Sequence, residues 1–144
     1  CLTQLNDDQL WWRPAESMNS IANLLLHLSG NIRQWLVAGL TAAEDKRQRQ
    51  QEFDDRSKRS KSQLQSTLAD AIAEACHVIE SQTAEELLRI RRVQEFDVSG
   101  LQAIFDSVSH FQGHVQEIIH MTRCQLGNDY KFYFVPEDQR PSVS

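Results

Sequence analysis

The chain has 144 residues, of which 40% are apolar and 24% charged. That size and balance are typical of one globular domain and exclude a wholly disordered chain. The formal net charge of -5 argues against a nucleic-acid binder or a protein of anionic membrane surfaces, because both need an excess of Lys and Arg. We therefore expect a small-molecule substrate or a protein partner.

The three cysteines, Cys1, Cys76 and Cys124, are widely spaced and form no C-x-x-C pair. Neither a disulfide framework nor a cysteine zinc site is indicated, which fits a reducing cytoplasm. The longest strongly apolar stretch, "IANLLLHL", is far shorter than the roughly 20 residues that span a bilayer, and no export signal is visible. We predict a cytoplasmic protein with no membrane partner. Because the chain begins with cysteine, we expect missing upstream residues; the alternative is a processed lipoprotein start.

Helical periodicity begins at the N-terminus. The opening "CLTQL" resembles the end of a helix whose beginning precedes Cys1. Residues 17–40, "SMNSIANLLLHLSGNIRQWLVAGL", then predict a long helix with Ser17 or Asn19 as its N-cap and Gly39 near its end. Its apolar residues recur at helical spacing: Ile21, Leu24, Leu25, Leu28, Ile32, Trp35 and Leu36.

Two further long helices follow a polar connection. Residues 41–62 carry both charge signs and are too polar to pack fully, so we predict a solvated crossover; an anion site is the alternative. One helix runs from a Ser-rich cap region to near Gln82, and the next from about Ser99 to Leu126, where Gly127 ends it. Gly and Pro are scarce, at 5 and 3, and no run alternates long enough to suggest a sheet. The fold class we predict is all-α, a four-helix bundle with a truncated first helix.

The C-terminal segment changes character. Its aromatic cluster, "YKFYF", is expected to pack back on the bundle, and its Pro-containing end to fray. We therefore divide the chain into one helical domain, 1–135, and a tail, 136–144.

The last predicted helix contains "SHFQGHVQEIIHM". At roughly 100° per residue, His110 and His114 differ by about 40° around the helix, a spacing that suits two ligands of one metal ion. Surface polarity is the alternative, and His120 points away from the pair. No H-E-x-x-H motif is present, which disfavours peptide hydrolysis. An adjoining apolar arc would place the pair on the border of the buried stripe: Ile104, Val108, Phe111, Val115, Ile118 and Thr122.

His27 occupies a similar border position on the first long helix, with leucines on one side and polar residues on the other. If the two helices are neighbours, three neutral imidazoles could bind one divalent cation and leave coordination positions open. Open positions would permit catalysis.

Three stretches, in order, carry a resemblance to a known family: "RPAESMNSIANLLLHLSGNIRQWL", "RQRQQEF" and "VSHFQGHVQEIIHMTRCQLGNDYKFY". They resemble the DinB/YfiT-like superfamily, and within it a branch known mainly as a domain of unknown function. The resemblance implies an up-down-down-up four-helix bundle with a divalent metal, commonly nickel or zinc, held by His27, His110 and His114. It also implies frequent homodimers and, in some members, S-transfer from a low-molecular-weight thiol.

Other residues near these motifs have open roles. This sequence has Val115, Gln116 and Glu117 where the branch has a small residue, Gly and Gln. Glu117 lies within about 60° of both histidines and could be an acceptor behind a ligand, an extra ligand, a proton acceptor or a solvated residue. Asn31 could orient a metal-bound water or satisfy the helix edge. We expect Trp11, Trp12 and Arg13 to pack under a loop rather than rim a pocket.

Two functions follow as hypotheses. In the first, a metal-dependent enzyme activates a small thiol or water, and the thiolate attacks an electrophilic small molecule. In the second, the same site is structural or vestigial in a non-catalytic dimeric bundle.

Overall fold

The structure, a computed structural model, describes residues 1–132. Three long helices dominate this part of the chain: α2 (Ile21–Ile32), α4 (Lys61–Glu80) and α6 (Gly100–Leu126). The shorter elements are the 3-10 turns Leu2–Gln4 and Gly127–Asp129, the helices α1 (Asp7–Trp11), α3 (Arg49–Asp54) and α5 (Ala84–Leu88), and the strands β1 (Ile90–Val93) and β2 (Phe96–Ser99). The predicted helical fold is confirmed.

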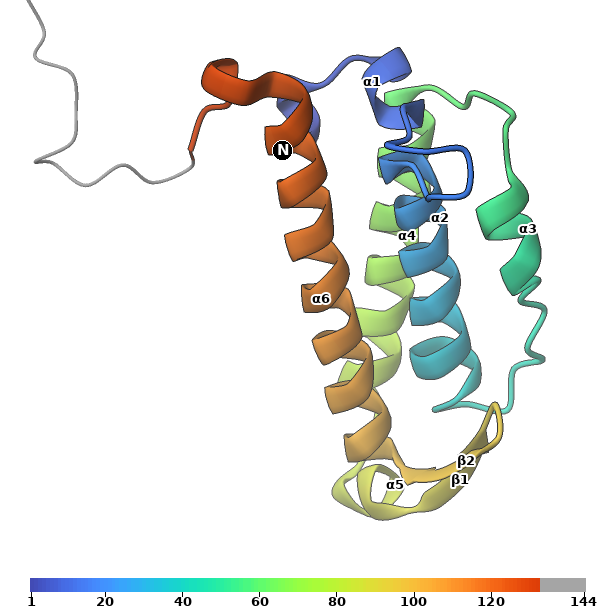
Figure 1. The fold of residues 1–144 in the computed structure, drawn as a ribbon. Coiled ribbons are helices and arrows are strands. Elements are labelled where there is room, and N and C mark those ends of the chain that lie inside the picture. The colour runs from blue at the N-terminus through green and yellow to red at the C-terminus, as the bar shows by residue number, and fades with distance from the viewer. Residues whose placement is uncertain (133–144) are drawn as a thin grey trace, which may run out of the picture.

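Helix α2 lies at the centre of the molecule (Figure 1). All its residues except Gly30 are buried, as expected for a helix that is covered on every side. It packs against α4 and α6, while α3 lies beside it on the side away from α6. Leu24, Leu25 and Leu28 form its main contribution to the apolar core. A side chain on α2 can therefore meet partners from several elements.

The N-cap of α2 differs from the prediction. Ser20, rather than Ser17 or Asn19, caps the helix: its side chain accepts from the Asn23 backbone N–H, and the Asn23 side chain accepts from the Ser20 N–H. This reciprocal pair fixes the start of the helix. The C-terminal end is also irregular, because residues Arg33–Ala38 form a π-helix with Gly39 as its C-cap. Such wider turns are frequent at functional sites.

A two-stranded hairpin joins α5 to α6, so the prediction that the chain contains no sheet was wrong. β1 and β2 pair antiparallel, with Val93 opposite Phe96 and Gln94 in the left-handed region at φ 54°. Each strand has four residues, which is too short for an alternating pattern to stand out in the sequence. The hairpin lies at the end of the molecule where α6 begins (Figure 1).

The first residues form a 3-10 turn within the described range, so the fourth long helix of a bundle stays a prediction. The segment after α6 contacts the first residues of the chain: Lys131 exchanges hydrogen bonds with the Gln4 side chain, and the Tyr130 hydroxyl lies 3.7 Å from the Cys1 Sγ. The remaining aromatics and the tail 136–144 lie outside the described residues. Among the helices of residues 1–132, none is long and apolar enough to cross a membrane.

Candidate metal centre

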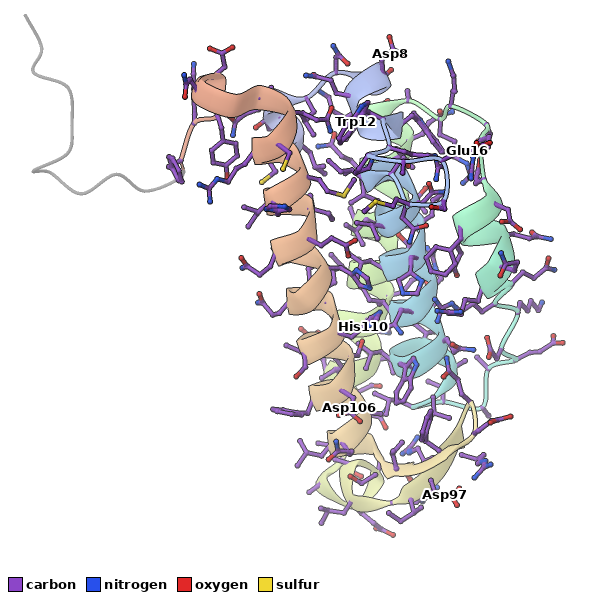
Figure 2. The ribbon with its side chains drawn as sticks, viewed as in Figure 1. Asp8, Trp12, Glu16, Asp97, Asp106 and His110 are labelled. Atoms are coloured by element: carbon purple, nitrogen blue, oxygen red, sulfur yellow. The ribbon has the colours of Figure 1, made fainter. Side chains whose placement is uncertain are left out.

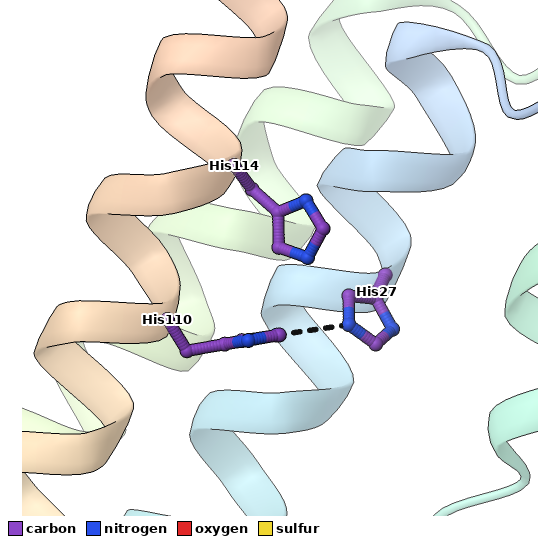
Figure 3. Close-up of side chains that lie close together, drawn as sticks. All are labelled: His27, His110 and His114. Carbon is purple, nitrogen blue, oxygen red and sulfur yellow. Dashed lines mark hydrogen bonds between the residues drawn. The ribbon is translucent and has the colours of Figure 1, made fainter.

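Three histidines from two helices converge at the middle of the molecule (Figure 3). His27 on α2 faces His110 and His114 on α6, and one ligand atom from each ring lies within 4.8 Å of the others. The Nε2 atoms of His27 and His110 are 3.0 Å apart. His27 is only 3% exposed, while His110 and His114 are partly buried, so the cluster lies between the helices with some access from solvent.

The histidines of α6 belong to its inward-facing line. The buried positions of that line are Ala103, Ser107, Ile118, Met121 and Thr122, and His110 and His114 fill the gap between the second and third of them. Both histidines are partly buried, which agrees with the predicted position at the border of the buried stripe, but Val108, predicted to belong to that stripe, is 52% exposed. Figure 2 shows His110 directed from α6 towards α2, with Asp106 one turn nearer the hairpin.

The outer nitrogen of His27 is held by the connection between α2 and α4. His27 Nδ1 lies 3.1 Å from Glu52 Oε2 and 3.0 Å from the Arg47 guanidinium, while Arg47 donates to both Glu52 oxygens at 2.8 Å. Since Arg47 is a donor only, the acceptor for an Nδ1–H of His27 is the Glu52 carboxylate. That tautomer leaves the Nε2 lone pair free to face His110 and His114.

Two side chains of this connection are unexpectedly buried. Arg47 is 4% exposed and Glu52 12%, whereas the sequence predicted a solvated crossover. Burial alone would raise the pKa of the Glu52 carboxyl, but hydrogen bonds and charge from Arg47 and His27 outweigh it and lower that pKa below its usual 4.5. Glu52 is therefore a carboxylate at neutral pH. The phenyl ring of Phe53 covers the His27 ring at a centroid distance of 4.7 Å.

Glycine in α2 makes room for this carboxylate. A Cβ atom on Gly30 would lie 1.9 Å from Glu52 Oε1 and 3.1 Å from Arg47 Nε. Sequence reasoning missed both Arg47 and Glu52, although they lie in or beside the "RQRQQEF" stretch. An unexplained glycine inside an otherwise leucine-rich helix was the available signal for a close approach.

Glu117 has one of the roles that the sequence left open. Its carboxylate lies 2.8 Å from Nδ1 of His114, where it can accept the ring N–H and leave Nε2 for the site. The pair is more exposed than His27 and Glu52, since Glu117 is 44% exposed. Glu117 does not line the pocket described below. His120 is exposed, as predicted, and lies beside Cys124 on the outer side of α6.

His110 is neutral at physiological pH. Burial, and to a lesser extent repulsion of a proton by His114, His27, Arg47 and Arg49, together lower its pKa from 6.5 to about 4. A neutral imidazole is the form that binds a metal ion.

The donor set fits a divalent ion. A tetrahedral ion at about 2.0–2.1 Å from each imidazole nitrogen separates two ligand nitrogens by about 3.3 Å. The His27–His110 separation of 3.0 Å is close to that value, and small rotations would bring the remaining nitrogens of the cluster, all within 4.8 Å, to it. Three protein ligands leave at least one coordination position free, as in catalytic zinc sites.

A pocket of about 960 Å³ opens beside His27 and His110. Its walls come from the π-helix, the hairpin turn, α6 and the connection before α3, so the irregular elements missed by the sequence form much of it. Trp35 and Phe96 face each other across 6.2 Å between ring centroids and supply an apolar wall. The polar lining residues are Asn31, Gln34, Arg47, Arg49, Gln94, Glu95, Asp106 and Ser107. The volume is that of a small-molecule site.

Asn31 lines this pocket, and its Oδ1 lies 3.5 Å from the Ser107 hydroxyl. This long contact leaves the amide group free to contact a ligand. The aromatic segment before α2 does not reach the pocket: Trp11 donates to the Arg59 carbonyl, and Arg13 binds Asn23 and the Met18 carbonyl. The expectation that this segment packs under a loop agrees with the contacts of Trp11 and Arg13, whereas Trp12 is 41% exposed.

Comparison with known proteins assigns the chain to a family but identifies no reaction. A search of curated proteins found no match to the chain. Residues 1–139 match a family described as "Protein of unknown function (DUF1572)". Since this match spans nearly the whole sequence, the chain belongs to the DUF1572 family.

Proposed function

We propose that this protein binds one divalent metal ion through His27, His110 and His114 and uses it on a small molecule. The observation that carries the proposal is the convergence of three imidazole nitrogens within 4.8 Å beside a pocket of about 960 Å³. A purely structural site needs no such space. Nickel and zinc are the ions we propose, because imidazole suits both.

Membership of the DinB/YfiT-like superfamily is part of this proposal. The ordered motifs of the sequence support it, as does the central position of α2 between α4 and α6. The up-down-down-up four-helix arrangement and the homodimer belong to the same proposal. Light scattering on a sized column would test the homodimer.

The reaction we propose is S-transfer from a low-molecular-weight thiol to a small electrophile. A bound divalent ion supplies Lewis acidity, which lowers the pKa of a thiol or water. In this reaction the thiol loses its proton, a new carbon–sulfur bond forms, and the electrophile's leaving group departs with the bonding electron pair. Trp35 and Phe96 offer an apolar surface for the electrophile, while Asn31 can hydrogen-bond its polar group. The alternative function is a non-catalytic metal-binding bundle.

Elemental analysis of natively purified protein tests the metal proposal. We expect about one divalent ion per chain, lost in His27→Ala and His110→Ala and retained in His120→Ala. His120→Ala is the matched control, since His120 is an exposed histidine on α6, the helix that carries His110. A metal-free native protein that also fails to bind added nickel or zinc would refute the proposal.

A panel of thiols and electrophiles then tests the reaction with metal-loaded protein. Metal-dependent consumption of thiol, absent in His110→Ala, would support the transferase. Full metal occupancy with higher thermal stability and no turnover on any member of the panel would favour the non-catalytic alternative.

A further inference from the structure

Asn23 is a fully buried amide near the start of α2, one turn before His27. Its oxygen accepts from the Arg13 guanidinium at 2.6 Å and from the Ser20 hydroxyl at 2.7 Å. All donors face the oxygen, and only carbonyl groups face the nitrogen. The orientation of the amide is therefore fixed by its partners.

The Asn23 nitrogen donates into the end of α3. Its acceptors are the carbonyl oxygens of Glu52 at 2.8 Å, Asp55 at 3.2 Å and Phe53 at 3.3 Å. These carbonyls belong to the last turn and the C-cap of a six-residue helix, where intrahelical partners are missing. A helix this short is not stable by itself. Contacts with α2 must therefore hold it in place, and Asn23 supplies the buried polar contacts with the α3 backbone.

Asn23 binds the backbone at the end of α3, and side chains of this helix contact His27 on the side away from His110 and His114. Glu52 accepts at Nδ1, and Phe53 covers the ring at 4.7 Å between centroids. A shift of the α3 backbone by about 1 Å would stretch the 3.1 Å contact beyond hydrogen-bond distance. One amide thus connects the capping box of α2 with the orientation of a histidine one turn later.

We propose that Asn23 is a positioning residue for the metal centre: by fixing the end of α3 it holds Glu52 on His27 Nδ1 and so directs His27 Nε2 towards His110 and His114. This inference rests on the metal proposal above. It assigns to Asn23 a role beyond helix capping.

The test compares metal affinity in variants of the full chain, using zinc or nickel in competition with a chromophoric chelator. Asn23→Asp keeps the oxygen that accepts from Ser20 and Arg13 but places a carboxylate against three carbonyls. We expect about a tenfold or greater loss of affinity, the lower end of what partners behind metal ligands contribute. Asn6→Asp is the matched control: Asn6 also caps a helix through a capping box, with Gln9, but within residues 1–132 it makes no hydrogen bond to α3.

A double-variant cycle tests whether Asn23 acts through Glu52. Glu52→Gln should itself lower metal affinity, and Asn23→Asp should add little when Glu52 is already Gln. Nitrogen-detected NMR of the zinc-loaded protein gives a second readout: His27 should carry its proton on Nδ1 in the wild type, with a hydrogen-bonded shift that Asn23→Asp removes and Asn6→Asp retains.

The outcomes separate the two proposals. Absence of metal binding in the wild type refutes the metal site itself. Wild-type binding with unchanged affinity and unchanged His27 shift in Asn23→Asp refutes the positioning role alone, as does full additivity in the cycle. If Asn23→Asp does not fold, Asn23→Ala is the second variant: it removes the contacts with the α3 carbonyls without burying a charge, and an affinity equal to the wild type would overturn the proposal.

Discussion

Replacing Gly30 by alanine has two opposite effects on stability: alanine favours the helix, but its Cβ occupies the space that Glu52 needs beside His27. An alanine in a helix interior is favoured over glycine by about 1 kcal/mol. The added Cβ would lie 1.9 Å from Glu52 Oε1 and 2.9 Å from its Cδ, where carbon and oxygen normally approach to about 3.2–3.4 Å. The carboxylate must therefore move by more than 1 Å.

That movement breaks contacts worth more than the propensity gain. Glu52 accepts two hydrogen bonds from Arg47 and one from His27, and hydrogen bonds to charged groups contribute about 1.5–3 kcal/mol each. Loss of one or two of them leaves a net destabilisation of about 0.5–5 kcal/mol after the gain of about 1 kcal/mol from alanine. We also expect metal affinity to fall by about 10- to 100-fold, because His27 loses its acceptor.

The assay pairs urea denaturation of the metal-free protein with chelator competition. Gly113→Ala is the matched control, because a Cβ at Gly113 has no atom within 4 Å among the described residues and the site is exposed on α6. That variant should be more stable than the wild type by about 1 kcal/mol, with unchanged metal affinity. If Gly30→Ala is stabilised as much as Gly113→Ala and binds metal as the wild type does, the proposed contact between Glu52 and His27 is refuted.

Three further predictions concern charge. Arg47→Ala leaves the nearly buried Glu52 carboxylate without its cation and should destabilise the fold by about 3 kcal/mol, measured by urea denaturation; equal stability would show that solvent reaches Glu52. Glu117→Ala should lower metal affinity less than Glu52→Gln does, because Glu117 is 44% exposed, and a larger loss in a chelator titration would contradict this. In metal-free protein, the free energy of unfolding should fall as the pH drops from about 6.5 to about 4, because in this range the His110 side chain binds a proton in the unfolded chain but stays neutral in the folded protein. His110→Gln should show a shallower fall, and identical slopes would argue against the lowered pKa.

The sequence predicted the long helices well, because each carries many apolar residues at helical spacing and a serine cap in or beside its first turn. It also identified the three histidines that the fold brings together, as spacing on α6 and the family resemblance indicated. It placed Val108 in the buried stripe of α6 although this residue is 52% exposed, whereas Ile118 and Thr122 of the same predicted stripe are buried. Val108 and Phe105 are apolar but exposed, and a pattern of residue types cannot distinguish an apolar residue that faces solvent from one that faces α2.

The parts that sequence reasoning missed depend on contacts between distant residues. The charged stretch that contains Arg47 and Glu52 is typical of a solvated linker, and most of its other residues are indeed exposed. These two side chains are buried only because each neutralises the other and because Gly30 leaves space for them. A local sequence pattern does not predict a buried ion pair of this kind, because only the tertiary structure brings Arg47 and Glu52 against His27.

The position of the pair has a chemical consequence for any ion bound at the centre. Three neutral imidazoles leave the charge of a divalent ion uncompensated, and the nearest buried groups, Arg47 and Glu52, cancel each other. Of these two groups, only Glu52 can accept a hydrogen bond from His27 Nδ1, and its negative charge increases the basicity of the His27 ring. The positive charge of Arg47, which binds the same carboxylate, makes this increase smaller. Replacing Arg47 should therefore strengthen the electron donation of His27 while weakening the fold. A cobalt-substituted protein would report the first change in its ligand-field spectrum and denaturation the second, so the two consequences of one substitution can be measured separately.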